Sequence, residues 1–240
     1  MKSEGGINIL AIEASSLASS AAVLSDDVIK AESFVCNKLT HSETLMPMID
    51  RTISDSGLTM QDMDAVAVTK GPGSFTGLRI GSATAKGLAE ALDIPVIEVP
   101  TVDALAMNMA FFDGLIVPLM DARRNETYTG IYTFEGGELK VIRPQCALPL
   151  AEILADVNER GVKTVFLGDG VKAFASSIQE NCRVPFMYAP ASQRLQRASS
   201  VAVLALKYHE KGQYVDAGDH VPTYLRVSQA ERERAARGET

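Results

Sequence analysis

Two segments of the sequence carry residue types that could bind a phosphate group or a metal ion. The first runs from Gly71 to Gly81, reads GPGSFTGLRIG, and leads from an apolar stretch into a helical pattern. Backbone N–H groups at the start of a helix attract anions, and Ser74 or Thr76 could cap that helix. However, Leu78 stands where a P-loop has its second glycine, and no lysine follows. The glycines therefore allow two interpretations, an anion site or tight backbone packing, and we favour packing.

The second segment reads DARRNETY, from Asp121 to Tyr128, and begins with an acid at the end of an apolar stretch. An aspartate at this place could support a metal-bound phosphate without contacting the metal directly. A turn closed by a salt bridge between Glu126 and either Arg123 or Arg124 explains the same residues. We favour the turn.

The histidines and cysteines do not have the spacing of a metal site or of a disulfide framework. No serine can be matched with a histidine and an acid as an activated nucleophile. We therefore expect no catalytic residue, no metal and no cofactor, whereas nucleotide binding stays undecided. The residues concerned are His41, His209, His220, Cys36, Cys146 and Cys182.

The periodicity of apolar residues predicts one order of elements, βββαβαβα, twice in succession. The first half is expected to hold strands over 7–13, 18–25, 28–36, 64–70 and 95–99, and helices over 42–56, 74–92 and 101–112. The second half is expected to hold strands over 115–121, 126–134, 138–143, 163–168 and 185–188, and helices over 149–159, 171–180 and 194–211.

This duplication predicts an α/β protein of two lobes, residues 1–112 and 113–240, with the helix over 194–211 able to pack back on the first lobe. Two such lobes facing one another form the actin-like (ASKHA, ribonuclease H-like) architecture, in which nucleotide lies in the cleft between the lobes. No proline-rich or serine-rich linker separates the halves, so we expect a continuous, packed pair.

The helices over 42–56 and 74–92 could each cover the sheet of their own lobe or form a surface for a partner. Gly77, Gly81, Ala85 and Ala89 follow one another at intervals of four residues, so one face of the second helix is almost bare and allows close approach. The sequence alone does not separate the two alternatives, and we take the partner surface as the hypothesis. Its residues are Leu45, Met48, Ile49, Thr52, Ile53, Phe75, Gly77, Leu78, Gly81 and Ala85.

Composition limits the possible partners. The chain has 240 residues, of which 46% are hydrophobic, and 23 basic against 30 acidic residues give a net charge of −7. Nucleic-acid binding depends on neutralising phosphates, so we expect RNA contact only together with a partner. No apolar run is long enough for a membrane span and no signal peptide is evident, so a cytoplasmic location is expected. Arg226, Arg232, Arg234 and Arg237 are expected in a solvated tail.

Four segments together resemble the TsaB family, also called YeaZ. They are ILAIEAS from Ile9, the stretch from His41 to Pro47, GPGSFTGLRIGSATAKGLA from Gly71, and DARRNETY from Asp121, and the match spans nearly the whole chain. The resemblance implies a bacterial protein of the actin-like class that helps to make threonylcarbamoyladenosine beside the tRNA anticodon. In that pathway the related TsaD transfers the threonylcarbamoyl group, and TsaE supplies an ATPase.

One departure from the catalytic relative decides what we expect of this chain. TsaD follows the equivalent strand with a pattern like Val-Asn-His-x-x-Gly-His, whose histidines hold a metal, whereas Thr101 and Leu105 stand at those places here. A leucine cannot coordinate a metal, and a hydroxyl is a poor substitute for imidazole. Glu13 also stands where the family more often has aspartate, which puts nucleotide binding in doubt.

The resemblance therefore implies a non-catalytic scaffold that forms a heterodimer with TsaD, offers a docking seam for TsaE and tRNA, and forms a homodimer when alone. Two enzymatic alternatives remain open at this point. One is an actin-like phosphotransferase that uses the cleft and Asp121, and the other is a glycoprotease-like hydrolase.

Overall fold

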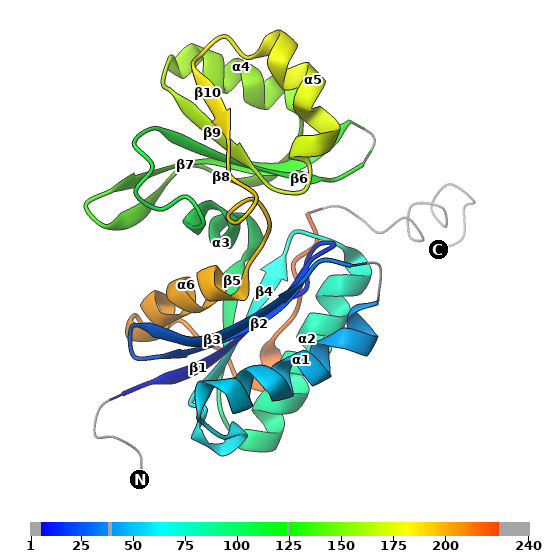
Figure 1. Ribbon diagram of the computed structural model, residues 1–240, viewed down its shortest axis with the longest axis vertical. Coiled ribbons are helices and arrows are strands. Elements are labelled where there is room, and N and C mark those ends of the chain that lie inside the picture. Colours follow the sequence, from blue (N-terminus) through cyan, green and yellow to red (C-terminus); the bar gives the residue numbers. More distant parts are fainter. Residues whose placement is uncertain (1–5, 38–39, 124, 226–240) are drawn as a thin grey trace.

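The computed structural model describes residues 6–37, 40–123 and 125–225, which form two lobes (Figure 1). Each lobe contains one five-stranded sheet, with strand orders β3-β2-β1-β4-β5 and β10-β9-β6-β7-β8. In both, the first strand pairs antiparallel with the second and parallel with the fourth, so the two sheets have one topology. The repeated order of elements predicted from the sequence is confirmed.

The strands of the first sheet are β1 (Asn8–Glu13), β2 (Ser19–Ser25), β3 (Val28–Val35), β4 (Ala65–Gly71) and β5 (Val96–Pro100). Those of the second are β6 (Leu115–Asp121), β7 (Glu126–Glu135), β8 (Glu138–Pro149), β9 (Thr164–Leu167) and β10 (Phe186–Tyr188). The α-helices are α1 (His41–Ser56), α2 (Phe75–Leu92), α3 (Thr101–Met107), α4 (Leu150–Arg160), α5 (Val171–Asn181) and α6 (Ala198–Glu210). Two short 3₁₀ helices are η1 (Met60–Asp62) and η2 (Ala217–Asp219).

The two lobes exchange helices. α1 and α2 cover one face of the first sheet, and α6, from the second half of the chain, covers the other face with Val201, Ala202 and Ala205 (Figure 1). In return α3, from the first half, lies between the lobes and packs Val102 and Leu105 against strands of the second sheet. α4 and α5 cover the remaining face of that sheet. Because each sheet is covered by a helix from the other half, the lobes are packed together.

Three element boundaries differ from the sequence prediction by more than one residue. The helix predicted over 101–112 ends at Met107, and the amide of Asn108 just beyond it donates to the backbone carbonyls of Gln193 and Leu195. Leu195, one of these acceptors, falls within the helix predicted over 194–211. In the structure this helix, α6, begins only at Ala198. β8 continues to residue 149 because it stays paired with β7 through two register shifts. None of the described helices is both long and apolar enough to cross a lipid bilayer.

The glycines of α2 lie in two different environments, one tightly packed and one open to solvent. A Cβ added at Gly77 would lie 2.1 Å from the backbone oxygen of Ala14, and one added at Gly81 would lie 3.3 Å from the Ala14 side chain. A Cβ at Gly87 would meet nothing within 4 Å, and Gly87 is exposed. Gly77 therefore lets the helix approach the segment after β1, whereas Gly87 has no such role in the folded chain.

Because these environments differ, replacing glycine with alanine should have opposite effects on the free energy of unfolding at Gly77 and at Gly87. Gly77→Ala should lower the free energy of unfolding by about 1–3 kcal/mol or more, because a backbone atom cannot move aside easily. Gly87→Ala should raise it by about 0.5–1 kcal/mol, because alanine favours an exposed helix interior. Urea unfolding followed by circular dichroism measures both. Equal effects of the two substitutions would contradict the packing described for Gly77.

Candidate partner surface and interlobe cleft

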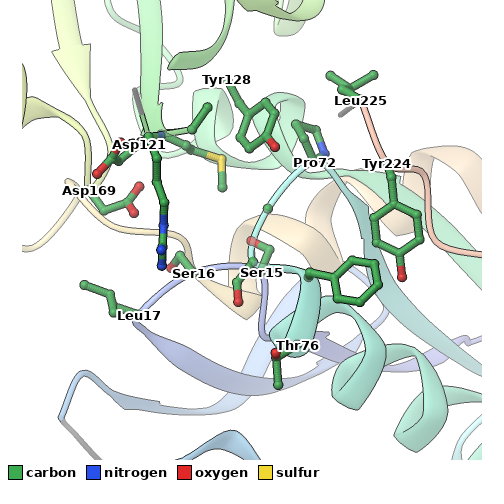
Figure 2. Close-up of a pocket in the computed structure, with 16 residues that line it drawn as sticks. Ser15, Ser16, Leu17, Pro72, Thr76, Asp121, Tyr128, Asp169, Tyr224 and Leu225 are labelled. Carbon is green, nitrogen blue, oxygen red and sulfur yellow. Dashed lines mark hydrogen bonds between the residues drawn. The ribbon is translucent and has the colours of Figure 1, made fainter. Parts of the chain in front are cut away.

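A cavity of about 450 Å³ lies between the lobes where the first loops of both sheets meet (Figure 2). Figure 2 shows Asp121 and Asp169 on the wall formed by the second lobe, with Ser15 and Ser16 on the wall formed by the first lobe. Tyr224 lines the cavity on the side away from Asp169. The complete lining consists of Ser15, Ser16, Leu17, Pro72, Gly73, Ser74, Phe75, Thr76, Met120, Asp121, Ala122, Arg123, Tyr128, Asp169, Tyr224 and Leu225.

The glycine-rich turn before α2 uses its groups for packing within the chain. The backbone N–H of Ser74 donates to the carbonyl of Ser15 at 2.7 Å, and the N–H of Gly77 donates to the hydroxyl of Ser74 at 3.3 Å. A Cβ at Gly73 would lie 2.4 Å from the oxygen of Ser15. Of the two interpretations of this turn, the contacts favour tight backbone packing over an anion site.

A buried carboxyl group lies under this turn. Glu13 is fully buried, and its Oε1 accepts hydrogen bonds from the backbone N–H and the hydroxyl of Ser15 at 2.6 and 2.5 Å. Its Oε2 has no hydrogen-bond partner among the described residues. Burial raises the pKa of Glu13 to about 7, although the hydrogen bonds from Ser15 oppose this shift. The segment after β1 is thus held around a carboxyl group that keeps its proton up to about pH 7.

The amide of Gln196 connects the lobes at the cleft, because it bonds to Ser16 of the first lobe and to a second acid, Asp169, of the second lobe. Gln196 is 1% exposed, accepts a hydrogen bond from the Ser16 hydroxyl at 3.0 Å and donates to Asp169 at 3.4 Å. Burial raises the pKa of Asp169, the bond from Gln196 lowers it, and the negative charge of Asp121 raises it further. Sequence reasoning missed Gln196, because it lies 180 residues from Ser16 in an unremarkable loop.

The DARRNETY segment forms a turn, as expected, in which the backbone N–H of Glu126 donates to the carbonyl of Arg123 at 3.2 Å, whereas the salt bridge to Glu126 stays a prediction. The backbone N–H of Arg123 donates to Asp121 at 2.7 Å, and Arg123 and Asn125 both have left-handed backbone, with φ of 63° and 61°. The alternative salt bridge through Arg124 lies outside the described residues, and so does the arginine-rich tail beyond Leu225. Cys36, Cys146 and Cys182 are free thiols.

The structure corrects the residues that we expected on a partner surface. Leu45, Met48, Ile49, Thr52 and Ile53 of α1 are all buried, with exposed fractions from 0 to 7%. Gly77, Leu78, Gly81 and Ala85 of α2 are buried too. The bare stripe of α2 packs on its own sheet, because the cost of leaving an apolar face in water favours covering the nearest strands. Of the ten residues, Phe75 alone stays partly exposed.

The outward faces of the same two helices carry different residues. On α2 these are mostly small, namely Thr76, Ala83, Gly87 and Ala91, whereas Arg79 and Glu90 are charged. On α1, Met46 is 47% exposed beside the exposed Pro47. The helices lie side by side on one face of the first lobe (Figure 1). They therefore present one continuous surface with an apolar part.

Comparison with known proteins identifies the family. A family model described as "TsaD: tRNA N6-adenosine threonylcarbamoyltransferase" matches residues 37–234. The tRNA threonylcarbamoyladenosine biosynthesis protein TsaB of Bacillus subtilis is 36% identical over 225 residues, which are 94% of this chain and 96% of that relative. The chain belongs to the TsaB family. The TsaB protein of Haemophilus influenzae is 40% identical over 129 residues, 51% of this chain and 52% of its own length.

Solved structures confirm the fold of this TsaB family member. YeaZ from Pseudomonas aeruginosa has a TM-score of 0.75 and 27% identity, covering 91% of this chain and all of that chain. Component A of the (R)-2-hydroxyglutaryl-CoA dehydratase of Acidaminococcus fermentans shares the fold alone, with a TM-score of 0.52 and 14% identity over 85% of this chain and 99% of that one. The two-lobed actin-like α/β fold expected from the sequence is confirmed.

The raised pKa of Glu13 predicts a specific pH dependence of stability. Between pH 4.5, its ordinary pKa, and about 7, the unfolded chain releases the proton while the folded chain keeps it. The free energy of unfolding should therefore fall as pH rises through this window, by up to about 3 kcal/mol, and change no further above it. Glu13→Gln should remove this component, because the amide does not titrate.

Urea unfolding at pH 5 and pH 8 measures this difference in the wild type and in Glu13→Gln. The exposed Asp50→Asn provides a control for the loss of one acid. If the stability gap between wild type and Glu13→Gln were the same at both pH values, the buried carboxyl would not be titrating as described.

Proposed function

We propose that this chain takes part in threonylcarbamoyladenosine biosynthesis on tRNA as a non-catalytic subunit that pairs with a TsaD-type transferase. The observation that carries the proposal is the family relationship along almost the whole chain, at 36% identity to a TsaB protein. In the proposed complex this chain supports the transferase and offers a docking seam for TsaE and tRNA. Alone, it would form a homodimer through the same surface.

The positions that hold metal ligands in the catalytic relative support a non-catalytic role. Thr101 and Leu105, which replace the two histidines, are both fully buried within α3. Leu105 belongs to the apolar cluster between α3 and the second sheet. A side chain in that environment contributes to packing and offers no ligand atom. The same positions argue against a metal-dependent glycoprotease.

The cleft gives little support to a phosphotransferase. Its glycine turn is engaged with Ser15, and the acids Asp121 and Asp169 face the cavity beside the buried Glu13. Those carboxyl groups that are ionised repel a polyphosphate unless cations accompany it. ATP turnover by the purified chain that is lost in Asp121→Ala would contradict the non-catalytic proposal.

The outward faces of α1 and α2 are the surface that we propose for the transferase. Small residues such as Ala83 and Gly87 allow another helix to approach closely, and Met46 can adapt to a partner. A standard interface covers about 800 Å² on each partner, an area that two adjacent helices of 16 and 18 residues can supply. The net charge of −7 favours RNA contact through the complex over binding by this chain alone.

A substitution on the outward face tests this surface. Ala83→Arg places a long charged side chain in the proposed helix contact, and the dissociation constant for the TsaD subunit should rise at least about tenfold. Buried residues such as Ile49 and Gly81 do not suit this test, because their substitution would damage the fold itself. Isothermal titration calorimetry measures the affinity, and threonylcarbamoyladenosine formed on tRNA in the reconstituted system measures the consequence.

Ala173→Arg provides the matched control, because Ala173 is exposed on α5, the helix of the second lobe that corresponds to α2. Both variants should keep the circular dichroism spectrum of the wild type. Wild-type affinity of Ala83→Arg for the TsaD subunit would exclude the outward face of α2 from the interface.

A further inference from the structure

An arginine on the outward face of α2 is held in place by an aromatic ring and has no charged partner within residues 6–37, 40–123 and 125–225. The guanidinium carbon of Arg79 lies 3.9 Å from the centroid of the Phe75 ring, one turn earlier on the helix. No ion pair or hydrogen bond of this guanidinium occurs among the described residues, and Arg79 is exposed. An arginine stacked on an aromatic ring loses less conformational entropy when it binds, because its side chain is already ordered.

The ring under Arg79 is itself supported by the C-terminal strap, residues 212–225. Tyr224 of the strap contacts Phe75 with the ring centroids 4.9 Å apart. The neighbouring Thr223 donates its backbone N–H to the carbonyl of Lys70 at 2.6 Å. A Cβ at Gly71 would lie 2.2 Å from the Thr223 oxygen, so the glycine is required for this contact.

The strap is anchored along its length on the first lobe, where the chain after α6 runs back beside α2 (Figure 1). Val215 exchanges two backbone hydrogen bonds of 2.9 Å with Val96 of β5. Lys86 of α2 donates to the carbonyls of Gly218 and His220, and Nδ1 of the buried His220 lies 2.7 Å from Glu98. These anchors fix the place of Tyr224, and through it that of Phe75 and Arg79.

We propose that the stack of Arg79, Phe75 and Tyr224 is a principal contact for the protein partner of this surface, and that Arg79 binds a carboxylate of that partner. The inference rests on the proposed function and names the chemistry at one point of its interface. Arginine and tyrosine are the residue types that most often carry binding energy at interfaces, especially where their geometry is already set. The planar guanidinium also matches a carboxylate in a two-point contact.

The surroundings favour a protein carboxylate over a nucleic-acid phosphate. Thr76, Ala83 and Gly87 next to Arg79 are uncharged and small, as in helix packing. Phosphate binding relies on several cations acting together, but Lys86 on the same helix already binds the strap. A cation without an ion pair among the described residues, beside the small uncharged residues Thr76 and Ala83, fits one acidic side chain on an opposing protein surface.

The test compares the affinity of full-length variants for the TsaD subunit by titration calorimetry at two salt concentrations. Arg79→Gln should weaken binding about 10- to 30-fold and reduce its dependence on salt, because one charge pair is lost. Arg79→Lys keeps the charge but not the planar group, so it should recover part of the affinity. Arg183→Gln, at an exposed arginine of the second lobe, is the matched control and should bind as the wild type does.

Tyr224→Leu distinguishes a positioning role from general damage. It should weaken binding less than Arg79→Gln, and the double variant should be little worse than Arg79→Gln alone, because both act through one group. Full additivity of the two substitutions would overturn the proposed dependence of Arg79 on the strap.

The remaining outcomes separate this inference from the proposed function. If Ala83→Arg abolishes binding but Arg79→Gln binds within twofold of the wild type, the inference fails and the proposed function stands. If neither variant changes the affinity, the surface itself is wrong. A loss in Arg79→Gln that affects only tRNA binding or only self-association would overturn the carboxylate contact with the TsaD subunit.

Discussion

The first lobe depends on the close approach of α2 to the segment that follows β1. The helix can reach this position because residue 77 is glycine, and any side chain there would collide with the carbonyl of Ala14. Ser15 then connects the segment to the turn before α2 and to the buried Glu13. This single contact turns the apolar stripe of α2 inward, and it thereby determines which residues of α2 remain for a partner.

The same contact gives the cleft its character. In an actin-like fold the loops at this place face the cavity between the lobes, but here the glycine turn binds its neighbour instead of presenting all its N–H groups. Gln196 links Ser16 to Asp169 across the lobes, and the acids around it are buried or face the cavity. The result is a cleft in which an amide joins the two lobes and burial raises the pKa of Glu13 and of Asp169, which suits a structural role better than phosphate chemistry.

The exchange of helices and the C-terminal strap make the two lobes one support for the outward face of α1 and α2. α6 and the strap both return to the first lobe, and the strap ends with Tyr224 against Phe75 at the start of α2. A surface supported in this way loses little entropy on binding, because its backbone and its largest side chains are already ordered. Rigidity of this kind is consistent with the supporting role that we propose.

The sequence by itself determined the order of elements and the duplicated α/β topology, because apolar periodicity and glycine turns act locally along the chain. The family was indicated separately, by the resemblance of four motifs. It also indicated that the glycines of the Gly71 turn permit tight packing. Tertiary structure alone decided that the stripe of Gly77 and Gly81 faces inward, because helical spacing shows that a face is bare but not what covers it. It likewise brought Gln196 to Ser16 and Tyr224 to Phe75, contacts between distant segments that no local pattern encodes.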